Sequence, residues 1–246
     1  TKSFRLGFAS YIPFGGQASW DQTSGTAGAP GSTDGPQRWH NISGIILAVY
    51  NTLAASYTIE PINLTVGASV SGVIHDVKTV RARTPDDSDD IVGADGSLKE
   101  GRSLLSASGF NLGASFGLYW HDDENRLRLG LAYLSQPGFG TTRMNGTLTQ
   151  QLGNAATANV EQKIDFLQTY PDIVRLGGAY RLPNDKVELR ADFEYVRWSV
   201  FDKQCVVLEG KNCDTNRETG AATSNPADIV INIQRNWKDA VGARAG

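Results

Sequence analysis

Residues 187–195 alternate strictly between apolar and charged side chains. The odd positions, from Val187 to Tyr195, are apolar, and the even positions, from Glu188 to Glu194, are charged. A period of two is typical of a β-strand whose two faces meet different surroundings. Four charged side chains in succession cannot face a dry protein core, so one face of this strand meets water.

The same alternation recurs in four other segments, at 62–71, 110–118, 126–133 and 173–182. The pattern predicts an all-β fold with about eight antiparallel strands. They are expected at about residues 3–14, 39–59, 62–83, 107–120, 126–144, 160–182, 187–206 and 228–246. Several exceed the roughly 9–11 residues with which a strand crosses a bilayer. We therefore expect them to protrude from the membrane on one side.

The connections between the predicted strands alternate strictly between short and long. Short turns are expected at 59–62, 121–126 and 182–186, and long polar loops at about 15–38, 84–106, 145–159 and 209–228. Outer-membrane barrels have short periplasmic turns and long extracellular loops. A soluble sandwich has no reason to separate its loops by length. The sequence therefore predicts a transmembrane antiparallel β-barrel.

Four aromatic side chains lie just before the short turns. They are Tyr57, Tyr119, Trp120 and Tyr180. Tyr and Trp at strand ends form the interfacial girdle of a membrane barrel, which is the role we expect for them. The alternative is that each is a core aromatic near the end of a strand.

Composition and motifs exclude several other classes of protein. With 23 Lys+Arg against 26 Asp+Glu the formal net charge is −3 at pH 7, so no basic excess exists to neutralise a nucleic acid. No run of about 18 charge-free apolar residues predicts a membrane-spanning helix. The three histidines lie far apart and no CxxC is present, so we expect neither a metal site nor a cofactor.

Four segments along the chain carry a family resemblance. They are LAASYTIEP at 53–61 running into LTVGA at 64–68, RLGLAYLS at 128–135 followed by Gly146, PDIVRLGGAY at 171–180 followed by FEYVRWS at 193–199, and NWKDAVGAR at 236–244. In this order they resemble the FadL-type outer-membrane transporters of long-chain fatty acids and hydrophobic compounds.

The resemblance implies a barrel of about 14 strands that is plugged by an N-terminal hatch. This chain would cover the middle strands, so we expect 1–246 to be a single barrel domain truncated at both ends. The resemblance also implies a place in the bacterial outer membrane, in contact with the lipid bilayer and lipopolysaccharide. It implies a hydrophobic small molecule as substrate and favours a monomer.

Eight charged side chains are assigned to the lumen. They are Arg126, Arg128, Arg175, Glu188, Arg190, Asp192, Glu194 and Lys238. Their expected role is a balanced network that hydrates the lumen floor and holds the plug. The alternative is that one cation receives a substrate carboxylate. Fatty-acid members of the family carry a basic residue in the Tyr-x-Ser segment, where this chain has Leu134. A neutral aromatic compound or an alkane is therefore also a candidate substrate.

The alternation breaks at the segment SYIPFGG, residues 10–16. A proline cannot donate to a β-ladder and paired glycines add no side chain, so a bulge or a local gap in the wall is expected. The resemblance places here the inward-kinked strand beside a lateral opening. The residues expected to line this passage are Tyr11, Pro13, Phe14, Gly15 and Gly16. The alternative is an ordinary strand end that leads into the loop 17–38.

Two predicted extracellular loops carry candidate chemistry. Cys205 and Cys213 flank the start of one loop on an oxidising side of the membrane, so we expect a disulfide, with two free thiols as the alternative. The loop 84–106 is acidic, which allows a weak calcium site or simply a solvated acidic loop. Its aspartates are Asp86, Asp87, Asp89, Asp90 and Asp95.

Together these features predict an outer-membrane channel for the passive uptake of hydrophobic molecules, with lateral release into the bilayer. Two other classes compete with it. One is a soluble β-sandwich with a binding or structural role. The other is a membrane-barrel hydrolase, which needs a Ser/His pair, but His121 is expected in a periplasmic turn and no serine has the context of a strained nucleophile.

Overall fold

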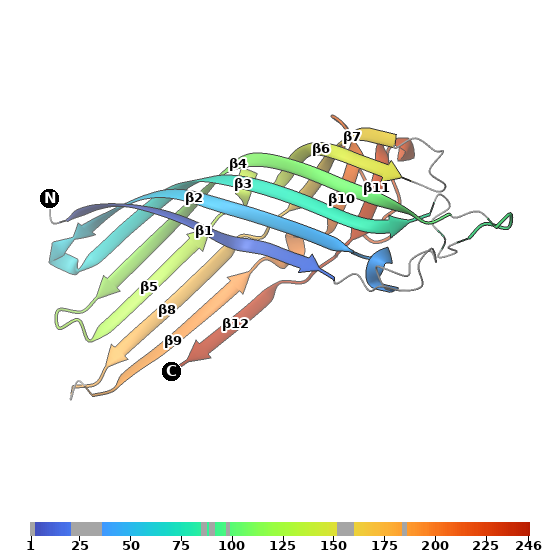
Figure 1. Ribbon diagram of the computed structural model, residues 1–246. Helices are drawn as coiled ribbons and strands as arrows, with labels where there is room; N and C mark the ends of the chain where they lie inside the picture. Colours follow the sequence, from blue (N-terminus) through green and yellow to red (C-terminus); the bar gives the residue numbers. More distant parts are fainter. Residues whose placement is uncertain are drawn as a thin grey trace.

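The computed structural model describes residues 3–20, 36–84, 88, 92–96, 99–151, 160–183 and 186–246. These residues form one antiparallel sheet of 12 strands (Figure 1). The strands are β1 (Phe4–Ser19), β2 (Ser43–Ile59), β3 (Leu64–Arg83), β4 (Gly101–His121), β5 (Leu127–Leu134), β6 (Thr141–Gln151), β7 (Val160–Thr169), β8 (Ile173–Arg181), β9 (Glu188–Val196), β10 (Lys203–Leu208), β11 (Ile229–Gln234) and β12 (Ala240–Ala245).

The described residues also form five short 3-10 turns that connect or interrupt the strands. They are η1 (Pro36–Trp39), η2 (Glu60–Ile62), η3 (Pro137–Phe139), η4 (Trp198–Val200) and η5 (Pro226–Asp228). Within the part of the chain that the structure describes, no helix has the length and apolar character needed to cross a membrane.

The sheet is an up-and-down meander that divides into two branches at β4. β1 to β4 pair in sequence order. Ser115–His121 of β4 then pairs with β5, whereas Arg102–Ser108 of the same strand pairs with β6. One branch continues β5-β8-β9-β12 and the other β6-β7-β10-β11. Consecutive strands such as β5 and β6 are therefore the two halves of one long span.

The eight predicted spans are present, but the prediction that the last four are uninterrupted is wrong. The structure divides each of the spans 126–144, 160–182, 187–206 and 228–246 into two strands. In the first of them the ladder is interrupted at η3. Pro137 has no N–H to donate and Gly138 adopts a left-handed φ of 68°, so this segment cannot continue a regular strand.

β1 continues past the Pro-Phe-Gly-Gly segment, whereas the sequence predicted an end near residue 14. Its pairing with β2 shifts by one residue between Tyr11 and Phe14, so that Ile12 and Pro13 together oppose Val49. This β-bulge accommodates the proline, and pairing with β2 resumes at Phe14.

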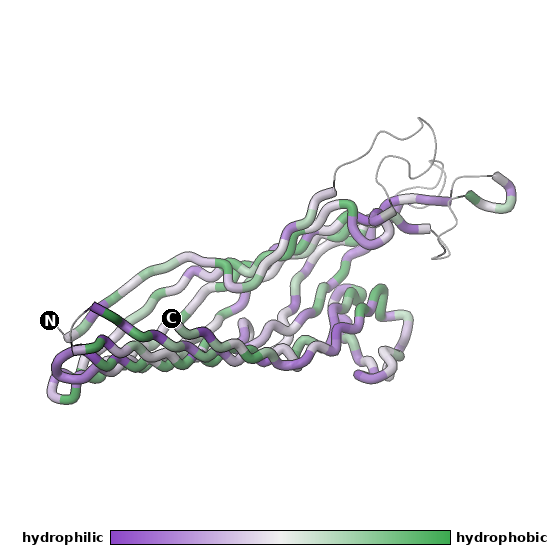
Figure 2. The backbone as a smooth tube through the Cα atoms, turned by 90° about the horizontal axis from the view of Figure 1, so that it is seen from below, coloured by the Kyte–Doolittle hydropathy of each residue, from purple (hydrophilic) through white to green (hydrophobic). Residues whose placement is uncertain are grey.

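The two edges of the sheet do not meet. Among the described residues β1 pairs only with β2, and β12 pairs only with β9, so the sheet is an open trough rather than a closed eight-stranded barrel (Figure 2). The strand ends that are joined by short connections lie at one end of the trough together with both termini, and the strand ends that lead into the long connections lie at the other end (Figure 1).

The outward face of β3 changes from apolar to polar along the strand. Val66 and Val70 point outward near the short turns, and Ile74 ends this apolar row. Asp76 and Lys78 then point outward on the same face. The stretch from 64 to 74 is about 33 Å long at about 3.3 Å per residue. Tilted by about 40°, it crosses about 25 Å, the height of the apolar band of an outer-membrane barrel.

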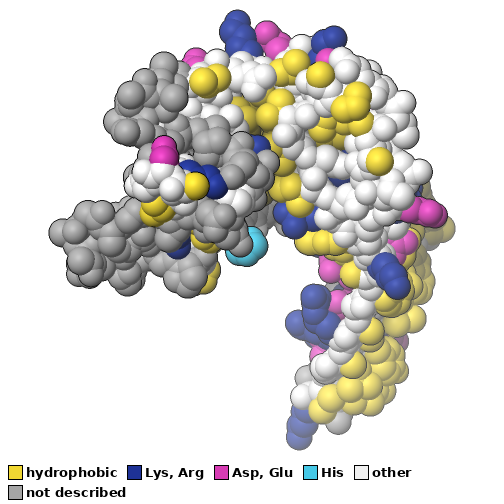
Figure 3. All heavy atoms as spheres, turned by 90° about the vertical axis from the view of Figure 1, so that its right-hand side faces the viewer, with side chains coloured by type: hydrophobic (Ala, Val, Ile, Leu, Met, Phe, Trp, Pro, Cys, Tyr) yellow, Lys and Arg dark blue, Asp and Glu magenta, His cyan; other side chains and the backbone are white. Residues whose placement is uncertain are grey.

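The inward face of β3 changes in the opposite sense. Ser69 and Ser71 point inward beside the apolar band, whereas Val73 and Val77 point inward beyond it and are fully buried. Figure 3 shows the same division on the lower arm of the wall, where hydrophobic side chains cover the outer side and charged side chains the inner side. The faces of the sheet therefore distinguish a membrane-spanning part from a part that protrudes.

Arginine substitutions at the centre of β8 test this assignment of faces. Leu176 is exposed on the outward face, and its neighbour Gly177 lies on the inward face opposite Asp192. Leu176→Arg is expected to lower the free energy of unfolding by roughly 2–4 kcal/mol, because an arginine near the bilayer midplane loses its hydration.

Gly177→Arg is the matched control, since the inward arginine gains a carboxylate partner, and its expected cost is below about 1 kcal/mol. Urea unfolding of both variants in lipid vesicles measures the difference. Equal costs at the two positions would contradict a lipid-facing outer side.

Candidate functional site

The floor of the trough carries a network of ion pairs near the short turns. Glu188 accepts hydrogen bonds from Arg128, from Arg190 at 2.6 Å and from Arg181 at 3.2 Å. Arg181 and Glu188 are directly opposite each other on β8 and β9. Cross-strand pairs of opposite charge stabilise a sheet, so these inward charges neutralise one another within the wall.

Two further pairs extend the network along β8, β9 and β12. Arg175 donates to Glu194, and Arg244 donates to Asp192 at 3.1 Å. Six of the eight predicted lumen charges are therefore brought together on one inward face. They are Arg128, Arg175, Glu188, Arg190, Asp192 and Glu194.

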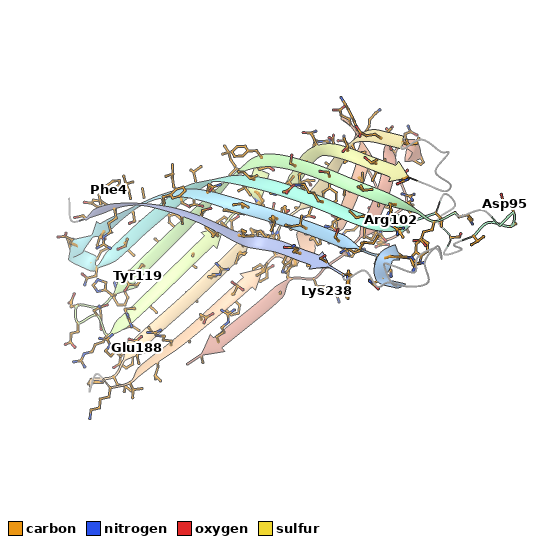
Figure 4. The ribbon with its side chains drawn as sticks, viewed as in Figure 1. Phe4, Asp95, Arg102, Tyr119, Glu188 and Lys238 are labelled. Atoms are coloured by element: carbon orange, nitrogen blue, oxygen red, sulfur yellow. A yellow bond between two sulfur atoms is a disulfide. The ribbon has the colours of Figure 1, made fainter. Side chains whose placement is uncertain are left out.

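The other two predicted lumen charges lie elsewhere. Arg126 pairs with Glu124 in the turn between β4 and β5. Lys238 lies between β11 and β12, at the end of β12 away from Glu188 (Figure 4), and forms no ion pair with any described residue. The alternating pattern predicted that both residues belong to strands and face the lumen. In the structure neither residue lies in a strand.

A lower cavity of about 780 Å³ lies above this floor. Arg5 and Arg175 reach it from opposite sides of the trough, and much of its wall is made of small residues of β2, β3 and β4. Thr52 and Ser71 share a hydrogen bond of 2.7 Å on that inward face. The lower cavity is therefore lined by hydroxyl groups as well as apolar atoms.

An upper cavity of about 700 Å³ lies toward the long loops. Its wall is the inward apolar face of the protruding part of the sheet. The aliphatic and aromatic residues that line it include Ile46, Val77, Leu105, Leu148, Phe166, Val206 and Ile231. Most of them also belong to, or pack against, one buried hydrophobic cluster. An apolar molecule in this cavity would be removed from water on several sides.

A group of aromatic side chains separates the two cavities, and we call it the neck. It consists of Phe14, Tyr50, His75, Tyr170 and Trp198. The ring of Phe14 lies 5.4 Å from Tyr170, 6.0 Å from Trp198 and 6.4 Å from Tyr50 between centroids. His75 stacks on Tyr170 at 5.2 Å. β1 thus contacts the breaks that follow β7 and β9, across the width of the trough.

The position of the neck follows from the order of residues along the strands. On β2, Thr52 lines the lower cavity and Ile46 the upper cavity, and Tyr50 lies between them. Phe14, Tyr170 and Trp198 line the upper cavity from its lower side. The neck therefore lies between the two cavities.

The predicted passage residues of β1 lie at the junction of the cavities. Tyr11 lines the lower cavity, Pro13 lines both, and Phe14, Gly15 and Gly16 line the upper one. A Cβ atom added at Gly16 would meet no heavy atom within 4 Å. A gap in the wall between β1 and β2 is not present, because the ladder between them resumes after the bulge.

Cys205 and Cys213 form a disulfide, the pairing expected from their place at the start of a loop. Cys205 is fully buried with Leu167 and Val207 beside the upper half of the sheet. Four of the five aspartates of the loop 84–106 lie outside the described residues, so the calcium interpretation has no described site. Where the chain is described, no group of three metal-ligating side chains is found.

Three of the four predicted girdle aromatics face outward near the short turns. They are Tyr57, Trp120 and Tyr180. Tyr119 is a wrong prediction, because it lies opposite Thr65 on the inward face and lines the lower cavity. Successive residues of a strand point to opposite faces, so Tyr119 and Trp120 cannot both face lipid.

A second row of tyrosines lies near the ends of β5 and β9 that point away from the short turns. The Tyr133 hydroxyl donates to Asp172 at 3.3 Å, and the Tyr195 hydroxyl donates to Asp239 at 2.6 Å. Hydrogen bonds from Tyr195 and from the backbone N–H of Ser199 lower the pKa of the Asp239 carboxyl. Tyrosines with apolar rings and hydrogen-bonded hydroxyls are typical of a membrane interface.

The neck residues Tyr50, His75, Tyr170 and Trp198 were missed at the level of sequence. They come from four different spans, and nothing local in the sequence brings them together. The signal available in the sequence was that Tyr50 and His75 occupy inward-facing positions of β2 and β3, whereas inward residues nearer the short turn, such as Thr52 and Ser71, are small.

One family of proteins matches almost the whole chain. The family described as "Outer membrane protein transport protein (OMPP1/FadL/TodX)" matches residues 2–246. No curated protein sequence matches the chain.

Solved structures with low sequence identity share its fold. A FadL homologue from Pseudomonas aeruginosa has a TM-score of 0.71 at 14% identity, with 100% of this chain and 53% of that chain covered. The toluene transporter TbuX from Ralstonia pickettii has a TM-score of 0.60 at 19% identity, with coverages of 98% and 61%. The Pseudomonas putida toluene transporter TodX has a TM-score of 0.61 at 16% identity, with coverages of 100% and 61%. The chain thus spans between about half and three fifths of these solved chains.

Truncation of Phe14 tests whether the neck is a packed barrier. Phe14→Ala removes the ring that joins β1 to Tyr170 and Trp198, and we expect a loss of about 3 kcal/mol in the free energy of unfolding. The tryptophan fluorescence should shift to the red, because water reaches Trp198.

Phe8→Ala is the fluorescence control, since Phe8 lies on the outward face of the same strand. Unfolding in urea and emission spectra in detergent measure both effects. A Phe14→Ala protein with the emission maximum of the wild type would mean that the neck is not packed.

Proposed function

The chain belongs to the outer-membrane transport family of FadL and TodX, and on this premise we propose that it forms the wall of a channel for hydrophobic molecules. The family consists of outer-membrane transport proteins and not of enzymes. The proposed transport is passive uptake, driven by the concentration of the substrate and by its preference for apolar surroundings.

One observation carries the proposal: an apolar cavity lies in the protruding part of a membrane wall. The upper cavity is close to the long loops, where a molecule from the medium would arrive, and the neck separates it from the lower cavity. A molecule that leaves water for the upper cavity gains about 0.8 kcal/mol for each buried CH₂ group. The same contacts would concentrate hydrophobic molecules at the entrance.

The proposed substrates are neutral hydrophobic molecules, with aromatic or aliphatic hydrocarbons favoured over long-chain fatty acids. Leu134 is buried and lines the lower cavity at the position where the fatty-acid members of the family carry a basic residue. The floor arginines Arg128 and Arg175 are engaged by Glu188 and Glu194. A free carboxylate would have to compete with these partners.

We propose that 1–246 is one part of a larger closed barrel. Unpaired backbone groups of β1 and β12 cannot lie in hydrocarbon, where each costs several kcal/mol. Further strands of the same barrel would pair with these edges, up to about 14 in all. The proposed barrel is a monomer whose outward band contacts lipid, with lipopolysaccharide at the second row of tyrosines.

The proposed exit for substrate is lateral, beside the bulge in β1. Pro13 lines both cavities, and the far edge of β1 has no partner among the described residues. A proline cannot donate from this position, so a strand that pairs with this edge would lose a hydrogen bond there. An opening toward the bilayer would spare a hydrophobic substrate from crossing water.

Uptake by intact cells tests the proposed function. Gram-negative cells that produce the full-length protein should accumulate radiolabelled toluene faster than cells with an empty vector. Gly16→Trp should abolish most of the difference, because the indole fills the open space beside Gly16 in the upper cavity. Gly242→Trp, at a glycine that also has free space but lies outside both cavities, is the control. Uptake equal to the empty vector for the wild type would refute the proposal.

Removal of the bulge tests the lateral exit. Deletion of Pro13 leaves Ile12 alone opposite Val49, which restores regular pairing without turning any other side chain to the opposite face. We expect uptake to fall at least several-fold while the protein remains folded in the outer membrane.

Pro13→Ala keeps the extra residue and is the control, with uptake expected to stay near the wild type. Heat-modifiable migration in gels verifies folding of both variants. Full uptake by the deletion variant would point to axial passage through the lumen.

A further inference from the structure

The neck contains buried polar atoms that have no partner in the protein. Tyr50 and His75 are fully buried and Tyr170 is 3% exposed. The two hydroxyl oxygens and both ring nitrogens of His75 form no hydrogen bond with any residue that the structure describes. Buried polar groups are normally paired, because an unpaired one loses its hydration without compensation. Four such atoms in one place therefore point to a ligand.

The three side chains lie close enough to act on one molecule. Tyr50 and His75 project from the same face of β2 and β3 as diagonal neighbours, because Tyr50 is opposite Val73 and Ala48 is opposite His75. Tyr170 approaches from the break after β7 and stacks on His75. Tyr170 also lines the upper cavity, so the three side chains form one group beside that cavity.

A polar track leads from the neck into the upper cavity. Gln168 lies two residues before Tyr170 near the end of β7, and both residues line the upper cavity. Gln204 donates to Gln168 at 2.6 Å, and Arg235 donates twice to Gln204 at 2.6 and 2.9 Å. Gln168, Gln204 and Arg235 all line the upper cavity. These three residues thus form a connected polar chain on the wall of the upper cavity.

We propose that the neck is a binding site for the hydroxyl group of a neutral hydroxylated aromatic compound, a molecule of the phenol class. The proposal rests on the proposed function and specifies its substrate class. The aromatic ring would pack against Phe14 and Trp198, whose centroids are 6.0 Å apart. Its hydroxyl would meet Tyr50, His75 and Tyr170.

The hydrogen-bonding capacity of the neck fits a hydroxyl group. A tyrosine hydroxyl both donates and accepts, and a neutral imidazole has one donor and one acceptor. A phenol offers one donor and acceptor lone pairs, so it satisfies several of these atoms at once. A pure hydrocarbon satisfies none of them and leaves the polar atoms of the neck without partners.

A carboxylate fits the neck less well than a hydroxyl. The buried cluster around Tyr50 and Tyr170 consists of apolar side chains, including Phe14, Val73 and Ile173. A charge in such surroundings loses its hydration at a high cost unless a cation is in contact with it. The neck therefore selects for a neutral polar group.

Calorimetric titration with three matched ligands tests the proposal. Toluene, p-cresol and p-toluate share one ring and methyl group, and they differ in carrying nothing, a hydroxyl or a carboxylate. The full-length protein in detergent is expected to bind p-cresol roughly 3- to 10-fold more tightly than toluene, the ratio that one net hydrogen bond provides. It is expected to bind p-toluate more weakly than toluene.

Variants that remove single hydroxyl groups locate the effect. In Tyr50→Phe and in Tyr170→Phe the ratio of the toluene and p-cresol dissociation constants should fall toward one. Tyr180→Phe is the control, because Tyr180 faces outward near the short turns, and it should keep the wild-type ratio.

The outcomes separate this proposal from the proposed function. A wild-type ratio of one, or a ratio that survives in both neck variants, would overturn the hydroxyl site while the channel for hydrocarbons stands. Absence of binding for both toluene and p-cresol would overturn the channel as well. The wild-type titration decides the matter even if a neck variant fails to fold.

Discussion

Water is absent from the interior of a membrane, so every backbone group there has to be paired within the sheet and every outward side chain has to be apolar. This constraint explains the hydropathy of β3 and β4, which run without interruption. Beside the band, outward residues such as Val70 and Phe116 are apolar and the inward faces carry Ser69 and Ser115. Past Ile74 the constraint no longer applies, and the two faces exchange their polarity.

The exchange of polarity also explains where the lumen can be blocked by apolar side chains. Next to the band, many inward residues of β2, β3 and β4 are small, and the inward charges of β5, β8 and β9 neutralise one another around Glu188. Beyond it, the inward face is apolar, and the breaks in the last four spans turn Tyr170 and Trp198 toward β1. The first break lies beside residues 109–114 of β4, close to the level at which outward Phe110 gives way to Ser108. The unbroken strands thus supply the wall, and the broken ones supply the neck.

The sequence was sufficient for the class of fold, the faces and the alternation of loop lengths, because a period of two is a local property. Whether a strand continues without a break is not a local property of the sequence. Nothing in the alternation of 126–144 distinguishes a break at Pro137 from a bulge such as that at Pro13. The candidate site was predictable only in part. The inward positions of the floor charges follow from the alternation of residues within each strand. The neck, in contrast, joins Phe14 to Tyr170 across the trough. Contacts between distant spans depend on the curvature of the sheet, which no single segment encodes.

The exchange of faces along β3 can be measured directly by spin labelling. Both native cysteines are in a disulfide, so single cysteines introduced at Val70 and at Lys78 can carry a label without competition. The two positions share one outward face. In lipid vesicles the label at Val70 should collide with oxygen more often than with a water-soluble nickel chelate, and the label at Lys78 should show the reverse. Labels with the same preference at both positions would contradict a membrane boundary near Ile74 and, with it, the exchange of polarity between the two faces of the sheet.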